Sequence, residues 1–172
     1  MVVEKFRQQI KEKLNGLTPK ETVFFAWLCG VRALPFLGAA GPFRYWISKE
    51  KGDMRLQHLL AVLRALDVAA ANANANVAAA AANAAFAAAA NAAAANAAFA
   101  AAFAADAADA AANAAFAADA AADAANKYSV DLQPLLLQDI EAIRFGHLGI
   151  HTALYGPIWQ RFQTALANIG CA

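Results

Sequence analysis

The sequence predicts an all-α fold, and two observations carry that prediction. Residues 68–126 contain only Ala, Asn, Phe, Asp and Val, and about seven in ten are Ala, which has the highest helix propensity. Outside this repeat, apolar residues recur every three or four positions, as on one face of a helix. We expect one helical domain over 1–172, a bundle organised around a long Ala-rich helix at 53–126. A helical pair with a loop (1–52) precedes that helix, and a second helical pair (127–172) follows it.

The N-terminal pair carries clear helix signals. An amphipathic helix is expected from Val3 to Asn15, with Phe6, Ile10 and Leu14 facing inward and Gly16 closing it. A second helix is expected to begin with Thr18 as N-cap and Glu21 completing a capping box. That helix should run to about Leu34, before Pro35. Its expected apolar face comprises Val23, Phe24, Trp27, Leu28 and Val31.

The stretch from Phe36 to Asp53 is predicted to be rich in loops, because Gly and Pro punctuate it. One helical turn or tucked loop is expected around four apolar or aromatic residues: Phe43, Tyr45, Trp46 and Ile47. Gly38 to Gly41 is interpreted as a turn, since the Lys-Ser/Thr of a phosphate loop does not follow it.

Asp53 is expected to cap the long helix, which then enters the Ala repeat without a stop signal. Its core-facing stripe should comprise Leu56, Leu59, Leu60, Leu63 and Leu66. Unbroken to Asn126, it would form a rod about 110 Å long. The alternative is a hairpin broken at Asn72 to Asn76, since Asn tolerates turn geometry. In the second half of the repeat the larger residues share one side, and the bare Ala side should let another helix approach closely.

In the C-terminal pair, Ser129 is the expected cap of a helix from Asp131 to Phe145, which Gly146 ends. The apolar positions of that helix are Leu132, Leu135, Leu136, Ile140 and Ile143. Pro157 should lie in the first turn of a last helix, Ile158 to Ile169, which Gly170 stops. The residues expected to face inward there are Trp159, Phe162, Leu166 and Ile169.

Charge is unevenly distributed although the net charge is only +1. Residues 1–66 hold eleven Lys or Arg against five Asp or Glu, whereas residues 67–126 hold five Asp and no basic residue. We expect these parts to attract each other, within the fold or between copies. No nucleic-acid partner is expected. A membrane span is not expected either, because Ala is barely apolar and Asn interrupts the uncharged run.

The cysteines indicate a reducing compartment and hence a cytoplasmic protein, since Cys29 fits a core position, Cys171 is terminal, and no secretory signal is evident. The chain could be a fragment of a longer protein. The repeat could be a degenerate Tyr-Ala-Ala repeat grown by DNA slippage, or an engineered replacement of Tyr.

No catalytic, cofactor-binding or metal-binding residue is assigned. His147 and His151 have the spacing of a helical metal pair, with Asp139 or His58 as conceivable third ligands, but nearby glycines favour loop histidines. Four acidic residues could form either a solvated face or a surface for a divalent ion or cationic partner: Asp106, Asp109, Asp119 and Asp123. Arg32 is expected to pair with an acidic residue inside the fold rather than bind a ligand.

Three short stretches carry a resemblance: Leu17-Thr18-Pro19, Phe24 to Cys29, and Val31 to Pro35. Together with the repeat and the later apolar residues Leu135 to Phe145 and Trp159, this order resembles Ala-rich helical regions of bacterial, notably cyanobacterial, multidomain proteins. The repeat departs from their Ala-Ala-Tyr pattern, because it lacks Tyr. The resemblance implies an accessory module beside signalling or defence domains, and no functional residue is carried over.

These observations favour a non-enzymatic helical module for protein interaction or oligomerisation, which binds partner helices or a second copy through the Ala face. One alternative is an ice-binding or surface-binding helix, although the repeat lacks Thr. Another is a membrane-active helix that would insert Phe86, Phe99, Phe103 and Phe116, against which the absence of Lys and Arg counts.

Overall fold

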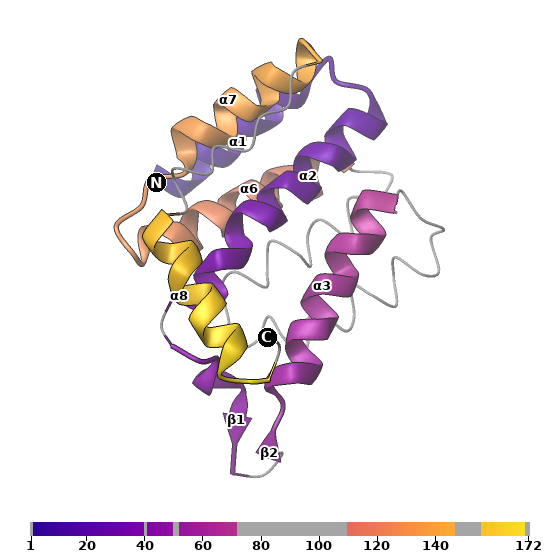
Figure 1. Ribbon diagram of the computed structural model, residues 1–172. Coiled ribbons are helices and arrows are strands. Elements are labelled where there is room, and N and C mark those ends of the chain that lie inside the picture. Colours follow the sequence, from indigo (N-terminus) through magenta and orange to yellow (C-terminus); the bar gives the residue numbers. More distant parts are fainter. Residues whose placement is uncertain (1, 40, 50–51, 72–109, 147–155, 171–172) are drawn as a thin grey trace.

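The computed structural model describes residues 2–39, 41–49, 52–71, 110–146 and 156–170 (Figure 1). These residues form six α-helices, two 3-10 helices and a short β ladder. The predicted all-α fold is therefore confirmed, and the ladder is a small local addition to it.

The N-terminal pair forms as the sequence predicts. Helix α1 spans Val2–Leu14 and α2 spans Pro19–Ala33, with the 3-10 helix η1 (Leu34–Leu37) directly after it. Both bonds of the capping box are present: the Glu21 N–H donates to Thr18 Oγ1 over 3.3 Å, and the Thr18 N–H donates to Glu21 Oε2 over 2.7 Å. The inward-facing residues of α1 are buried as expected: Phe6, Ile10 and Leu14.

Helix α2 lies at the centre of the bundle, where it packs against α3, α6 and α7. The apolar face predicted for it is only partly correct. Val23 and Leu28 are buried, whereas three of the predicted residues are half-buried: Phe24, Trp27 and Val31. Phe25 and Cys29 are fully buried instead. A helix with neighbours on several sides buries more than one stripe, so periodicity alone could not identify the deepest face.

The loop region contains more structure than the sequence predicts. The expected helical turn is the 3-10 helix η2 (Arg44–Trp46). Strands β1 (Ile47–Ser48) and β2 (Gly52–Asp53) then pair antiparallel, with Ile47 opposite Asp53. Strands of two residues leave no periodic pattern, which is why they were not predicted.

Two described helices lie at the two ends of the long Ala-rich segment. Helix α3 spans Arg55–Ala71 and α6 spans Ala110–Asn126, and both pack against α2. A straight helix would place Ala71 and Ala110 about 58 Å apart, whereas the 15 residues of α2 extend about 22 Å. Helices α3 and α6 are therefore not collinear parts of one straight rod. The break predicted at Asn72 to Asn76 lies outside the described residues.

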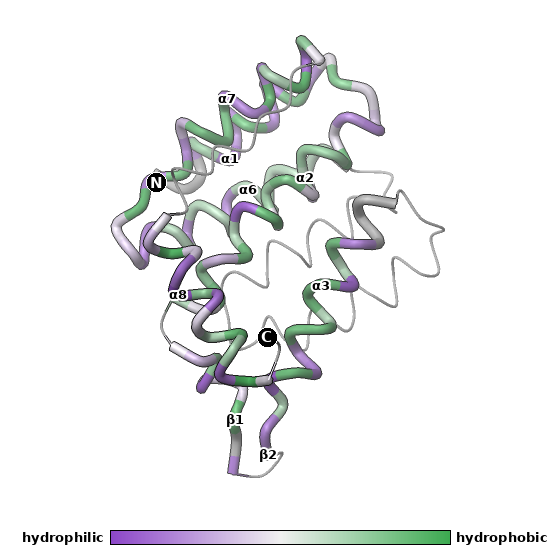
Figure 2. Tube along the Cα trace, viewed as in Figure 1, coloured by the Kyte–Doolittle hydropathy of each residue, from purple (hydrophilic) through white to green (hydrophobic). Residues whose placement is uncertain are grey.

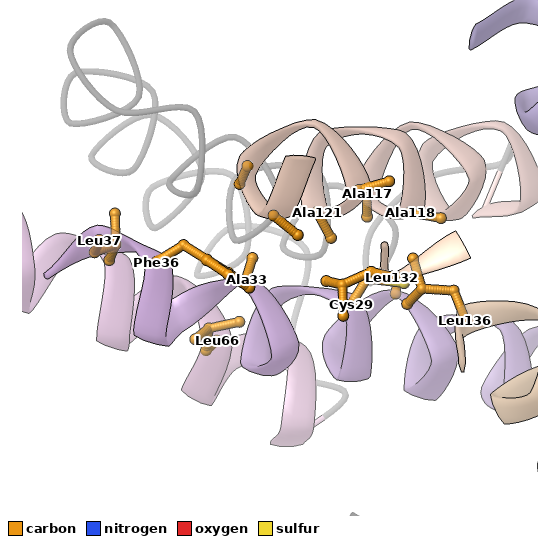
Figure 3. Close-up of a cluster of buried hydrophobic side chains, with 14 of the residues drawn as sticks. Cys29, Ala33, Phe36, Leu37, Leu66, Ala117, Ala118, Ala121, Leu132 and Leu136 are labelled. Carbon is orange, nitrogen blue, oxygen red and sulfur yellow. The ribbon is translucent and has the colours of Figure 1, made fainter. Parts of the chain in front are cut away.

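The Ala side of α6 packs as the sequence predicts. Eight alanines there are at most 2% exposed: Ala114, Ala115, Ala117, Ala118, Ala121, Ala122, Ala124 and Ala125. Figure 3 shows Ala117, Ala118 and Ala121 directed toward α2, where Cys29 and Ala33 lie. Small side chains let the two backbones approach, and contacts between α6 and both α2 and α1 fill the centre of the fold.

Helix α7 (Gln133–Arg144) begins two residues later than predicted and has a different cap. Ser129 adopts a φ of 59° and does not cap it. Asp131 Oδ1 instead accepts a hydrogen bond from the Gln133 N–H over 3.0 Å. The predicted end is correct, since Gly146 follows α7 with a φ of 70°. Of the five expected apolar positions, Leu135 is partly buried. The other four are buried: Leu132, Leu136, Ile140 and Ile143.

Helix α8 (Gly156–Ala167) packs against η1, and its inward face is centred on Phe162. Ile158 and Ala165 are also buried, and Leu166 and Ile169 pack at the edge of the core. The inward placement predicted for Trp159 is wrong, because its side chain is exposed. Trp159 lies near the start of α8, where its ring packs beside Phe162 with ring centroids 5.5 Å apart.

Candidate functional site

An exposed leucine stripe on α3 is the feature of this fold that best fits binding of another chain. We use the name leucine stripe for Leu56, Leu60 and Leu63, which are 49%, 42% and 40% exposed. Steps of four and three residues place them on one face of the helix. The core-facing stripe predicted from the sequence therefore divides in two. Leu59 and Leu66 face the core, as does Val62.

Local contacts hold the first turn of α3 against the short ladder of β1 and β2. Asp53 Oδ1 accepts a hydrogen bond from the Arg55 N–H over 3.1 Å, as expected of a capping residue. The Arg55 guanidinium donates to both oxygens of the same carboxylate and keeps the pKa of Asp53 below its usual value. The Met54 N–H donates to the Trp46 carbonyl. The Trp46 and His58 rings pack edge to face, with ring centroids 5.5 Å apart. The orientation of α3, and with it the stripe, is thereby fixed.

Polar side chains border the leucine stripe. Gln57 and Arg64 lie along one flank, and Asp67 follows the stripe one turn after Leu63; all three are exposed. An apolar centre with a polar border is the usual composition of protein interfaces. Figure 2 shows how densely hydrophobic residues follow one another along α3, at the side of the bundle.

The predicted internal partner of Arg32 is Asp139. Arg32 Nε lies 2.5 Å from Asp139 Oδ2 and Nη2 lies 2.6 Å from Oδ1, which is a bidentate pair between α2 and α7. Both side chains are buried. Nearby Cys29 is buried as predicted, and burial raises the pKa of its thiol well above the usual value, with a further contribution from the Asp139 charge. The Arg32–Asp139 pair thus joins α2 and α7 within the core.

The acidic part of the repeat pairs with basic residues of the same chain where the structure describes it. Arg7 Nη2 lies 2.5 Å from Asp119 Oδ2, and the guanidinium also lies over the Phe116 ring, 5.6 Å from its centroid. Asp123 lies 3.6 Å from the Lys127 ammonium. The predicted attraction between the N-terminal part and the repeat is confirmed for Arg7 and Asp119, within one chain. Asp106 and Asp109 lie outside the described residues.

The residues considered as metal ligands do not assemble in the described part of the chain. His147 and His151 lie outside it. Asp139 binds Arg32, and His58 packs beside Trp46. No group of three or more His, Cys, Asp or Glu side chains suited to a metal ion occurs among the described residues.

No protein-family model, curated protein or solved structure matches this chain. The resemblance to accessory regions of bacterial proteins therefore stays a prediction. Among the helices of the described residues, none combines the length and the hydropathy needed to span a membrane.

Sequence reasoning missed the leucine stripe, although all three leucines belong to the predicted helix. Leucines recur at several angles around α3, so the pattern contains two apolar faces and does not indicate which faces the core. The sequence did show that the apolar residues of this helix fall on two separate faces. Leu59, Val62 and Leu66 follow the spacing of a single face, and the leucine stripe follows a second face of its own.

Proposed function

We propose that this protein is a non-enzymatic helical interaction module and that the leucine stripe is its docking surface. The observation that carries this proposal is the exposure of three leucines at positions i, i+4 and i+7 on a helix held firmly at its start. Large apolar side chains on one exposed helix face are the anchors by which amphipathic helices bind each other. An accessory role beside signalling or defence domains would suit such a module.

The docking surface proposed here differs from the Ala face. In α6 the Ala side is buried against α2 and α1 of the same chain, so residues 110–126 do not offer it to a partner. The same burial counts against an ice-binding role for this part of the repeat, because that role needs a flat, exposed face.

The occupant that we propose is the α3 helix of a second copy. A surface that binds its own copy about a two-fold axis must be complementary to itself, and a row of leucines packs well against an identical row. Complete burial of a leucine contributes about 1.5–3 kcal/mol, and these leucines are already about half buried. Three such anchors give a weak dimer unless neighbouring polar residues extend the contact, so we expect association in the micromolar range or weaker.

Size-exclusion chromatography with light scattering over a range of concentrations tests this proposal. We expect the wild-type mass to approach that of a dimer at a few hundred micromolar. Leu60→Glu should keep the protein monomeric, because dimer formation would then bury an unpaired carboxylate at the centre of the apolar stripe.

Phe145→Glu is the matched control. Phe145 is the most exposed of the large hydrophobic residues described, at 74%, and lies beyond the end of α7 rather than on α3. The Phe145→Glu variant should associate as the wild-type protein does. A wild-type protein that stays monomeric at all concentrations, or equal loss of association in both variants, would contradict the proposal.

A further inference from the structure

A groove of about 380 Å³ lies between α8 and the loop that follows η1. One wall comprises polar side chains of α8 and the turn after it: Gln160, Arg161, Thr164 and Asn168. The opposite wall includes Gly38, Gly41 and Pro42. The polar residues recur at one-turn intervals, so they form a row about 12 Å long on one side of the helix. This groove is separate from the leucine stripe.

The shape of the groove is fixed by close packing beneath it. A Cβ atom on Gly38 would lie 2.8 Å from Phe162 Cα, so only glycine permits this approach of the loop to α8. Phe43, which follows the loop, has a φ of 56°, an unusual conformation for an aromatic residue. Its buried ring stacks on Trp46 and meets Phe162 edge-on, and these contacts hold that conformation. The groove is therefore formed before any ligand arrives.

The polar wall offers hydrogen-bond donors and positive charge. Thr164 Oγ1 already donates to the Gln160 carbonyl over 3.0 Å, and Asn168 Nδ2 donates one hydrogen to the Thr164 carbonyl over 2.8 Å. Neither of these two bonds uses the Gln160 side-chain amide, the second N–H of Asn168 or the Arg161 guanidinium. No acidic residue is among the described residues that line the groove.

We propose that this groove binds a small molecule that carries a phosphate or carboxylate group, with Arg161 as the main anchor. The planar guanidinium presents paired donors that match two oxygens of either group. The side-chain amides of Gln160 and Asn168 supply further donors along the row. The volume lies within the range of small-molecule sites.

Backbone amide shifts of the full chain, titrated separately with inorganic phosphate and with succinate, test this proposal. We expect saturable shifts in residues 156–168 and in Gly38, Ala39 and Gly41 with at least one probe, and the responding probe identifies the anion class. Arg161→Gln should raise the dissociation constant about tenfold, since a charge-assisted hydrogen bond contributes at least that factor.

Lys20→Gln is the matched control, because Lys20 is also an exposed basic residue of a helix and lies in the first turn of α2, away from both the groove and the leucine stripe. It should bind the probe as the wild type does. Absence of saturable shifts at these residues with both probes would overturn the proposal. Equal weakening by the two substitutions would also overturn it, because binding would then depend on overall charge.

Discussion

Arg32 and Asp139 form a buried bidentate ion pair between α2 and α7. Replacing Asp139 by Ala removes the carboxylate that the buried guanidinium contacts, while the cost of desolvating the arginine remains. We expect Asp139→Ala to lower the free energy of unfolding by about 3–5 kcal/mol. Urea denaturation followed by circular dichroism measures this loss.

The double variant Arg32→Met, Asp139→Leu separates the effect of the charge from that of packing. We expect it to be considerably more stable than Asp139→Ala, because apolar side chains of similar volume replace a desolvated pair. A loss below about 1 kcal/mol in Asp139→Ala would show that the guanidinium finds adequate solvation elsewhere.

Glu21 gives the start of α2 a dependence on pH. Hydrogen bonds from the Thr18 backbone and side chain lower the pKa of the Glu21 carboxyl below its ordinary value of 4.5. A group with a lowered folded-state pKa stabilises the protein above its unfolded-state pKa, and that contribution is lost as the pH falls through the folded-state pKa. We therefore expect Glu21→Gln to be less stable than the wild type at pH 7, and this difference to shrink below pH 4.5. Thermal melts of both proteins from pH 7 to pH 3 measure it, and a difference independent of pH would contradict the assignment.

The elements that were predicted correctly are those whose signals are local. Thr18 and Glu21 form their capping box within one turn, and Gly146 ends α7 through its own backbone conformation. The faces of the helices were less predictable, because burial depends on neighbours distant in sequence. The sequence of α3 alone therefore did not show that the leucine stripe would be exposed. Asp139 could not be named as the partner of Arg32 for the same reason, because the two lie 107 residues apart. The groove beside α8 likewise combines two segments that no sequence pattern relates.

The contact between α2 and α6 depends on the small size of alanine. Ala121 is fully buried, and a leucine there would require the helices to separate or its neighbours to leave favourable rotamers. We expect Ala121→Leu to destabilise the protein by about 1–3 kcal/mol in urea denaturation. Ala167→Leu, at an exposed position in α8, is the control and should change stability by less than about 0.5 kcal/mol. Equal effects would indicate that the Ala side of α6 is loosely packed.

The contact between η1 and α8 depends on Gly38 in a similar way. In Gly38→Ala the new methyl group would meet the backbone of Phe162, and α8 would have to shift. We expect a loss of about 1–3 kcal/mol. Gly156→Ala is the matched control, since a Cβ there meets nothing within 4 Å. Thermal melting compares the two, and a destabilised Gly156→Ala with an unaffected Gly38→Ala would contradict the packing described.

The bundle as a whole protects Cys29. Helix α2, which carries this thiol, packs against α3, α6 and α7, so the sulfur becomes accessible only when several helix contacts are lost together. In a Cys171→Ser background we expect an aromatic disulfide reagent to label Cys29 in the native protein at least about a thousandfold more slowly than in the unfolded chain, in line with the stability of small domains. The labelling rate should rise with urea in parallel with global unfolding measured by circular dichroism. Labelling within tenfold of the unfolded rate, without loss of helical signal, would show that α2 opens independently of the bundle. The central position of α2 predicts the opposite, because each of its neighbours would have to release it.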